Sequence, residues 1–187
     1  MDRLTRMPRR PPQPDWSRVR LLAMDVDGVL TDGTVLILAA GGEGKSFSIL
    51  DGHGLRLLER AGVVTAWISG RASEATTRRA RELRIPHLFQ GRLDKRTVLA
   101  DLAGRLGLTA ADCAYIGDDE IDVEALRWAG IGIAPAAAMP AALAAAAYVP
   151  ARPAGHGAVR EVCDLILAAR QARPTPRTRR VPAPRAR

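Results

Sequence analysis

Residues 19–33 read VRLLAMDVDGVLTDG, an apolar run that leads directly into a group of carboxylates. A short, continuous apolar run of this kind is typical of a strand that is buried on both faces of a sheet. Gly28 allows a sharp exit from the strand, so that Asp25 and Asp27 can both reach one centre. Two like charges this close repel each other unless a cation bridges them. An acidic turn that merely ends a strand would read the same way, so this motif alone does not decide.

A second group of carboxylates follows another apolar run, CAYIG at 113–117. Asp118, Asp119 and Asp122 crowd the predicted turn from that strand into a helix. One aspartate near a helix start can be a simple cap. Three of them, together with two on an earlier strand of the same sheet, indicate a hard divalent cation with oxygen ligands, most simply Mg²⁺.

Two further features carry the charge pattern of a phosphate site. Ser69-Gly70-Arg71 follows the apolar run 63–69, where a hydroxyl and backbone N–H groups at a helix start can hold an anion. Lys95 opens a predicted helix, where its charge is unfavourable against the helix dipole. An ordinary turn and a solvent-exposed lysine remain the alternatives. Taken together, a carboxylate nucleophile, a metal, an anion cradle and a lysine suit phosphoryl transfer through an aspartyl-phosphate.

The rest of the chain alternates strand-like and helix-like segments, which predicts an α/β fold: a three-layer, Rossmann-like parallel sheet with helices on both faces. Functional groups should then collect at the carboxyl ends of the strands. Residues 34–38 and 45–49 predict a short β-hairpin flap, too small to be a cap domain. The other strands are expected at 19–27, 63–69, 87–89, 113–117 and 131–134, and the helices at 55–61, 72–84, 94–107, 120–130 and 158–170.

Composition indicates one folded domain between two basic tails. The chain has 187 residues, 47% of them hydrophobic and 26% charged, which excludes wholesale disorder. The net charge of +8 is carried by the two ends, and residues 21–169 have a net charge of −3. We expect disordered Arg/Pro-rich tails at 1–17 and 172–187, and one folded domain with the phosphoryl-transfer site at 18–171.

The same numbers bear on partners and location. Basic tails could bind nucleic acid through its phosphates, but with 4% aromatic residues the chain offers no base-stacking platform, so nucleic acid is an unlikely partner. The N-terminus lacks the apolar run of a signal peptide, and prolines interrupt the uncharged segment 128–151, so we expect no membrane segment. Cys113 and Cys163 lie in apolar stretches, which fits a reducing cytoplasm.

Four motifs, in order across residues 25–122, make the chain resemble the haloacid dehalogenase superfamily of phosphatases. Over residues 19–170 it is most similar to the uncapped subclass that acts on 3-deoxy-D-manno-octulosonate 8-phosphate. The stretches that carry this closer likeness are DVDGVLTDG at 25–33, FSILDGHGLR at 47–56, SGR at 69–71, LFQGRLDK at 88–95, YIGDDEID at 115–122 and GHGAVREVCDLIL at 155–167.

The resemblance implies roles for the carboxylates. Asp25 would be the nucleophile and a Mg²⁺ ligand. Asp27 would be the general acid/base and would offer its backbone carbonyl to the metal. Asp118 would be the third protein ligand, with Asp119 and Asp122 supporting the waters of the metal.

It also implies how the substrate is held. Ser69 and Lys95 would hold the phosphate as part of the catalytic set. The positions that would contact the sugar acid or shape its pocket are Asp27, Ser48, Ile49, Leu50, Asp51, Gly52, Arg56, Arg71, Arg79 and Lys95. Members of this family close the uncapped site by forming a homotetramer.

The implied reaction is Mg²⁺-dependent hydrolysis to 3-deoxy-D-manno-octulosonate and phosphate, in lipopolysaccharide precursor synthesis. A phosphatase of a nine-carbon 2-keto sugar acid phosphate is the alternative. Relatives with that preference tend to carry an acidic residue where this chain has Arg71. A nucleic-acid-binding protein that uses its Arg tails is the third reading.

Overall fold

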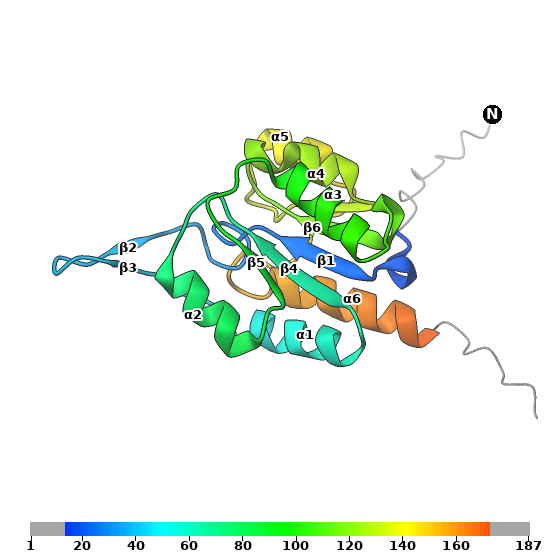
Figure 1. The fold of residues 1–187 in the computed structure, drawn as a ribbon, viewed down its shortest axis with the longest axis horizontal. Coiled ribbons are helices and arrows are strands. Elements are labelled where there is room, and N and C mark those ends of the chain that lie inside the picture. The colour runs from blue at the N-terminus through cyan, green and yellow to red at the C-terminus, as the bar shows by residue number, and fades with distance from the viewer. Residues whose placement is uncertain (1–13, 173–187) are drawn as a thin grey trace, which may run out of the picture.

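The computed structural model describes residues 14–172, and most of both predicted tails therefore lies outside the described residues. Its centre is a five-stranded parallel sheet with the strand order β5-β4-β1-β6-β7 (Figure 1). The strands are β1 (Leu21–Met24), β4 (Val64–Ile68), β5 (His87–Phe89), β6 (Cys113–Ile116) and β7 (Ile131–Ile133). The central strand β1 pairs in parallel with β4 on one side and with β6 on the other.

Helices cover both faces of the sheet. In Figure 1, one face carries α1 (Ile49–Arg60), α2 (Glu74–Leu83) and α6 (Ala158–Ala172), and the other carries α3 (Lys95–Arg105), α4 (Val123–Trp128) and α5 (Pro140–Ala145). Short 3-10 helices lie at Trp16–Arg18, Ala110–Asp112 and Glu120–Asp122. The three-layer α/β fold expected from the sequence is confirmed.

Each face of the sheet has its own hydrophobic core. Leu22 and Met24 of β1 contribute to the core under α1 and α6, while Leu21 and Ala23 contribute to the core under α3 and α4. Successive side chains of a strand point to opposite faces, so a strand covered on both sides must be apolar at every position. All four residues of β1 are buried. A polar side chain therefore first appears directly after the strand, at Asp25.

The segment between β1 and α1 contains the antiparallel hairpin β2 (Leu36–Ile37) and β3 (Glu43–Gly44) and no further domain. The hairpin projects far from the sheet (Figure 1). The prediction of a hairpin flap without a cap domain is therefore confirmed, but the prediction of a strand at 45–49 is wrong. Ser48 accepts the backbone N–H groups of Leu50 and Asp51 as an N-cap, and α1 begins at Ile49. The helix thus begins earlier than the expected residue 55.

Two other segments differ from expectation. The Ala-rich, uncharged segment contains α5, whose first residue is Pro140; proline suits the first turn of a helix because no N–H is needed there. Near the N-terminus, within the segment expected as a tail, Trp16 is buried and packs edge-on against Tyr148 at 5.1 Å. None of the helices in residues 14–172 is long and apolar enough to cross a membrane.

Candidate active site

Three of the predicted site residues follow neighbouring strands at the same edge of the sheet. Asp25 follows β1, Ser69 follows β4 and Asp118 comes shortly after β6. Lys95 is the first residue of α3, which follows β5, and it reaches the same edge. In a parallel sheet the carboxyl ends of all strands meet at one edge, which is where such folds bind ligands.

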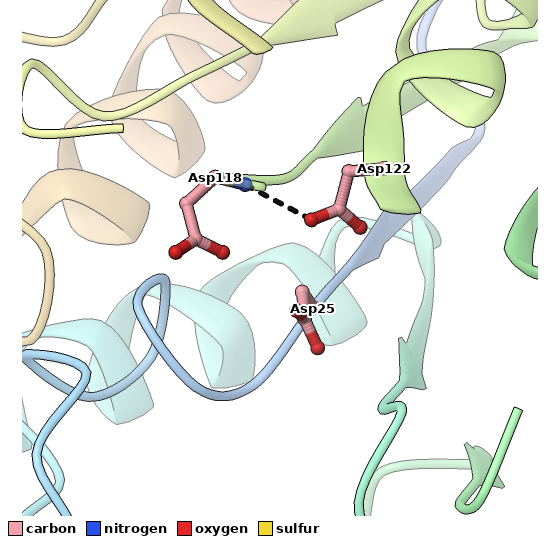
Figure 2. Close-up of side chains that lie close together, drawn as sticks. All are labelled: Asp25, Asp118 and Asp122. Atoms are coloured by element: carbon pink, nitrogen blue, oxygen red, sulfur yellow. Dashed lines mark hydrogen bonds between the residues drawn. The ribbon is translucent and has the colours of Figure 1, made fainter. Parts of the chain in front are cut away.

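Asp25, Asp118 and Asp122 form a compact acidic cluster, in which one oxygen from each carboxylate lies within 4.8 Å of the others (Figure 2). Asp25 and Asp122 are buried, and Oδ1 of Asp118 is buried without a hydrogen-bond partner among residues 14–172. Gly28 makes room for the cluster: a Cβ there would lie 1.9 Å from Oδ2 of Asp118. Carboxylate oxygens are the donors that a hard divalent cation prefers, so this cluster fits a Mg²⁺ ion.

Each carboxylate oxygen of Asp122 already accepts two hydrogen bonds from the protein. Its Oδ1 accepts hydrogen bonds from Lys95 Nζ at 2.8 Å and Tyr115 OH at 2.7 Å. Its Oδ2 accepts the backbone N–H groups of Asp118 and Asp119, both at 3.1 Å. A carboxylate with two donors on each oxygen has little capacity left for a metal. Asp122 is therefore suited to orient the turn that carries Asp118, while Asp118 and Asp25 keep free capacity.

Lys95 balances the charge of the cluster. Its Nζ lies 2.7 Å from Oδ2 of Asp25 and 2.8 Å from Oδ1 of Asp122, and the residue is 1% exposed. Burial alone lowers the pKa of Lys95, but the two carboxylates more than offset it, so the pKa is raised overall. Lys95 is therefore a buried cation. The alternative from the sequence, that Lys95 is exposed to solvent, is excluded.

The carboxylates themselves carry excess negative charge. Burial raises the pKa of Asp25 to about 6 although Lys95 opposes it. Burial and the charges of Asp25 and Asp122 raise the pKa of Asp118 to about 7. One lysine thus does not neutralise the cluster. A divalent cation between Asp25 and Asp118 would offset the negative charge that Lys95 leaves uncompensated.

Asp27 faces the base of the hairpin rather than the acidic cluster. Lys45 Nζ lies 2.7 Å from its Oδ1 and donates a hydrogen bond to its Oδ2 at 2.8 Å. The Lys45 side chain has no exposed area, while that of Asp27 is 20% exposed. Sequence reasoning assigned Lys45 no role. The feature of the sequence that could have pointed to Lys45 is that it is one of only two lysines among 28 cationic residues.

Ser69 and Arg71 form the turn after β4. Ser69 is buried, and its Oγ accepts the backbone N–H of Arg71 at 3.1 Å. The Arg71 side chain is half exposed and pairs with Glu43 of the hairpin, with Nη2 and Oε2 2.7 Å apart. Its Nε also lies 3.9 Å from Oδ2 of Asp27. Arg71 thus reaches across to the hairpin instead of pairing within α2, the helix that follows it.

A second group of predicted residues gathers at the start of α1. The carbonyl of Ser48 accepts a hydrogen bond from Arg79 Nη2 at 3.3 Å. A Cβ at Gly52 would lie 2.6 Å from the same nitrogen, so the glycine permits this approach. Ile49 and Leu50 are apolar and exposed, at 81% and 43%. Ile49 and Leu50 thus present an apolar surface at the helix start.

Three of the predicted residues make contacts within the fold. Asp51 is buried, and its oxygens accept the backbone N–H groups of Arg160 at 2.7 Å and Gly157 at 3.3 Å. Arg56 pairs with Glu59 one turn further along α1. Arg56 also donates to the carbonyl of Leu83 at 3.3 Å. The exposed Asp119 accepts the N–H of Glu120 as a helix cap. Asp51 and Arg56 thus join α1 to α6 and α2.

The comparisons with known proteins agree with this geometry. A family model of haloacid dehalogenase-like hydrolases matches residues 63–161. The 3-deoxy-D-manno-octulosonate 8-phosphate phosphatase of Yersinia pestis is 42% identical over 153 residues, which are 82% of each chain. The same-named protein of Escherichia coli K12 is 40% identical over 151 residues, 81% of this chain and 80% of that protein.

Solved structures give the same result. A 3-deoxy-D-manno-octulosonate 8-phosphate phosphatase from Moraxella catarrhalis, in complex with magnesium, phosphate and a KDO molecule, superposes with a TM-score of 0.82 at 44% identity, covering 84% of this chain and 90% of that one. A cobalt-bound relative from Haemophilus influenzae has a TM-score of 0.80 at 39% identity, covering 84% of this chain and 92% of that one. This chain belongs to the 3-deoxy-D-manno-octulosonate 8-phosphate phosphatase family of haloacid dehalogenase-like hydrolases.

Proposed function

We propose that this chain hydrolyses 3-deoxy-D-manno-octulosonate 8-phosphate to 3-deoxy-D-manno-octulosonate and phosphate, in lipopolysaccharide precursor synthesis. The observation that carries the proposal is the convergence of Asp25, Asp118 and Lys95 at the carboxyl edge of the sheet, with an unpartnered Asp118 oxygen among the described residues. The names of the relatives in Yersinia pestis and Moraxella catarrhalis support the choice of substrate.

Asp25 attacks the phosphorus atom in the first step. The bond from phosphorus to the sugar oxygen breaks, and the protonated carboxyl of Asp27 gives its proton to that oxygen, which leaves as the alcohol. An aspartyl-phosphate remains on Asp25. In the second step the Asp27 carboxylate takes a proton from a water molecule that attacks the phosphorus, and phosphate and free Asp25 are released.

Mg²⁺ is the cofactor of this proposal. The carboxylates of Asp25 and Asp118 and the backbone carbonyl of Asp27 would hold it, and Asp122 would keep the Asp118 turn in place. Bound there, the ion would supply positive charge to the acidic cluster and to the phosphoryl oxygens.

The phosphate and the sugar acid need separate anion sites. Ser69 and Lys95 would serve the phosphate, together with backbone N–H groups of the turn after β4. The exposed guanidinium of Arg71, beside Asp27, would bind the carboxylate of the sugar acid, because arginine can grip a carboxylate with two parallel hydrogen bonds. Arg71 would have to exchange Glu43 for the substrate. The start of α1, with Ser48, Gly52 and Arg79, would shape the pocket.

A homotetramer in the cytoplasm is part of the same proposal. Apolar side chains of the hairpin are exposed in the single chain, Leu36 at 64% and Ile37 at 73%, as is Ile49 at the start of α1. Exposed apolar patches of this kind mark interaction sites, and a neighbouring copy would cover them and close the open site. Sedimentation of the purified chain tests the assembly.

A substrate panel with Mg²⁺ tests the function. It compares the octulosonate phosphate, a nine-carbon 2-keto sugar acid phosphate and a neutral hexose phosphate, using the wild type and Arg71→Ala. We expect the octulosonate phosphate to be preferred by the wild type. Arg71→Ala should lower kcat/KM for it by roughly 30- to 1,000-fold, about 2–4 kcal/mol, with little effect on the neutral ester. A nine-carbon preference would reassign the substrate, and equal losses on both ester types would remove Arg71 from carboxylate binding.

A further inference from the structure

We propose that Lys45, at the base of the β2–β3 hairpin, is a positioning residue that holds the Asp27 carboxyl group where it can protonate the leaving oxygen. The inference rests on the proposed function, because it takes Asp27 as the general acid of that reaction. It also gives the hairpin a second task, since the hairpin then supplies a residue of the site as well as a surface.

The geometry of the pair carries the inference. Lys45 Nζ lies within 2.8 Å of both Asp27 oxygens, so a single ammonium group fixes the ionised carboxylate. When Asp27 carries the proton of the first step, the ammonium can keep its contact with the other oxygen. The lysine side chain has no exposed area, while Asp27 keeps 20% of its side chain exposed. The ammonium therefore approaches Asp27 from the protein interior, and the carboxyl group remains accessible to a ligand.

Stability alone does not account for a buried lysine at this place. Removing an ammonium group from water is costly, and a buried ion pair often contributes little net stability. The chain otherwise uses arginine for 26 of its 28 cationic residues. Lysine offers a compact charge on a flexible stem, whereas the planar fork of arginine needs more room. A compact cation behind the carboxylate thus suits the task of fixing Asp27.

The pair is part of an alternating arrangement of charges that ties the hairpin to the site. Glu43 lies 3.9 Å from Lys45 and 2.7 Å from Arg71, and Arg71 lies 3.9 Å from Asp27. Positive and negative groups thus alternate around the four members. Because Glu43 and Lys45 both belong to the hairpin base, its position determines where Asp27 and Arg71 are held.

A direct role for Lys45 in substrate binding is the competing explanation. Its Nζ already contacts both Asp27 oxygens and its side chain is not exposed, so a substrate contact would require that pair to break. The two explanations predict different leaving-group dependence. A sugar alkoxide leaves only with a proton, whereas p-nitrophenolate leaves without one.

The test compares Lys45→Met with the wild type on the octulosonate phosphate and on p-nitrophenyl phosphate, both with Mg²⁺. The measured quantity is kcat/KM, which covers the steps up to loss of the leaving group and excludes hydrolysis of the aspartyl-phosphate. We expect a loss of about 10- to 100-fold on the sugar ester and less than about threefold on the aryl ester. Retained aryl phosphatase activity also shows that the variant folds.

A double-mutant cycle with Asp27→Asn sharpens the test. If Lys45 acts through Asp27, Lys45→Met should change the ratio of sugar-ester to aryl-ester kcat/KM by less than about twofold in the Asp27→Asn background. Asp32→Asn is the matched control, because it removes an exposed charge from the segment between β1 and the hairpin and leaves the Lys45–Asp27 pair. It should keep the ratio of the wild type.

Equal losses on both esters in Lys45→Met would overturn the inference in favour of a phosphate contact or a structural role. No loss on either ester would show that Asp27 needs no positioning by Lys45. If the wild type hydrolyses p-nitrophenyl phosphate but not the octulosonate phosphate, the proposed function fails separately. The ratio is then measured with an alkyl phosphate that the wild type accepts, and the same outcomes apply.

Discussion

Asp51 and Asp25 are both almost fully buried, at 1% and 5% exposure, but their surroundings differ. The oxygens of Asp51 face two backbone N–H groups at the start of α6. Asp25 faces a lysine and two further carboxylates, and one oxygen of Asp118 in that cluster has no partner within residues 14–172. Both carboxyl groups have raised pKa values, chiefly because of burial.

The difference lies in what compensates the buried charge. Backbone N–H donors of a helix start compensate Asp51 within the fold, and these contacts hold α1 against α6. The acidic cluster holds more negative charge than its one lysine offsets, and a cation must come from solution to complete it. Burial of a carboxylate therefore does not by itself indicate a functional site, whereas incomplete compensation does.

The largest expected effect is that of Asp25→Asn. The amide cannot attack phosphorus, so turnover should fall by at least about 10⁴-fold in a steady-state assay with the sugar acid phosphate. Thermal unfolding should show an intact fold, because the change removes one of three crowded carboxylates. Activity within about tenfold of wild type would refute the nucleophile assignment.

Metal removal is the second test of the acidic cluster. Excess chelator should lower activity by at least about 100-fold, and Mg²⁺ should restore it. Ca²⁺ should inhibit, because it is larger and takes more ligands, which disturbs the in-line geometry of attack. Undiminished activity in chelator would mean that the cluster needs no cation, and the contrast with Asp51 would disappear.

Asp51→Asn tests the other side of the comparison. An amide keeps one acceptor oxygen but places N–H donors against the N–H groups of α6, so stability should fall by about 1–3 kcal/mol in urea unfolding. With folded protein, kcat/KM should stay within about threefold of wild type. Asp164→Asn, at an exposed pair on the same helix, is the control and should cost at most about 0.5 kcal/mol. A raised KM without loss of stability would instead make Asp51 a substrate contact, as the family resemblance implies.

The smallest expected effect is a pH dependence of stability. The pKa values of Asp25, about 6, and Asp118, about 7, lie above the ordinary 3.8. The stability that their protonated forms contribute is therefore complete below an unfolded-state pKa of about 4 and is lost as the pH rises through 6 to 7. Mg²⁺ competes with these protons, so it should raise Tm by a few degrees more at about pH 8 than at about pH 5.5.

Asp118→Asn is the control for this last measurement. Without the Asp118 charge the effect of Mg²⁺ on Tm should be small at both pH values. An equal Mg²⁺ effect at both pH values in the wild type would contradict the raised pKa values as the source of the metal's stabilisation.

Much of the site could be predicted because it follows recognisable strands. Asp25 and Ser69 come directly after apolar runs, and the order of strands and helices predicts that the ends of those strands lie at one edge. The start of α1 could not be predicted as well. The strand-like pattern at 45–49 competes with the N-cap signal of Ser48. In the structure the helix forms, because α1 packs against α6.

By itself, the sequence determined the α/β class, the flap without a cap domain and the placement of Asp25, Ser69 and Asp118 at strand ends. These features depend on local periodicity and on residues next to each other in the chain. Only the tertiary structure decided which charges compensate each other. Lys45 is 18 residues from Asp27, and the donors to Asp51 are 106 and 109 residues away. Such partners are chosen by how the hairpin and helices pack, and no local pattern encodes that choice.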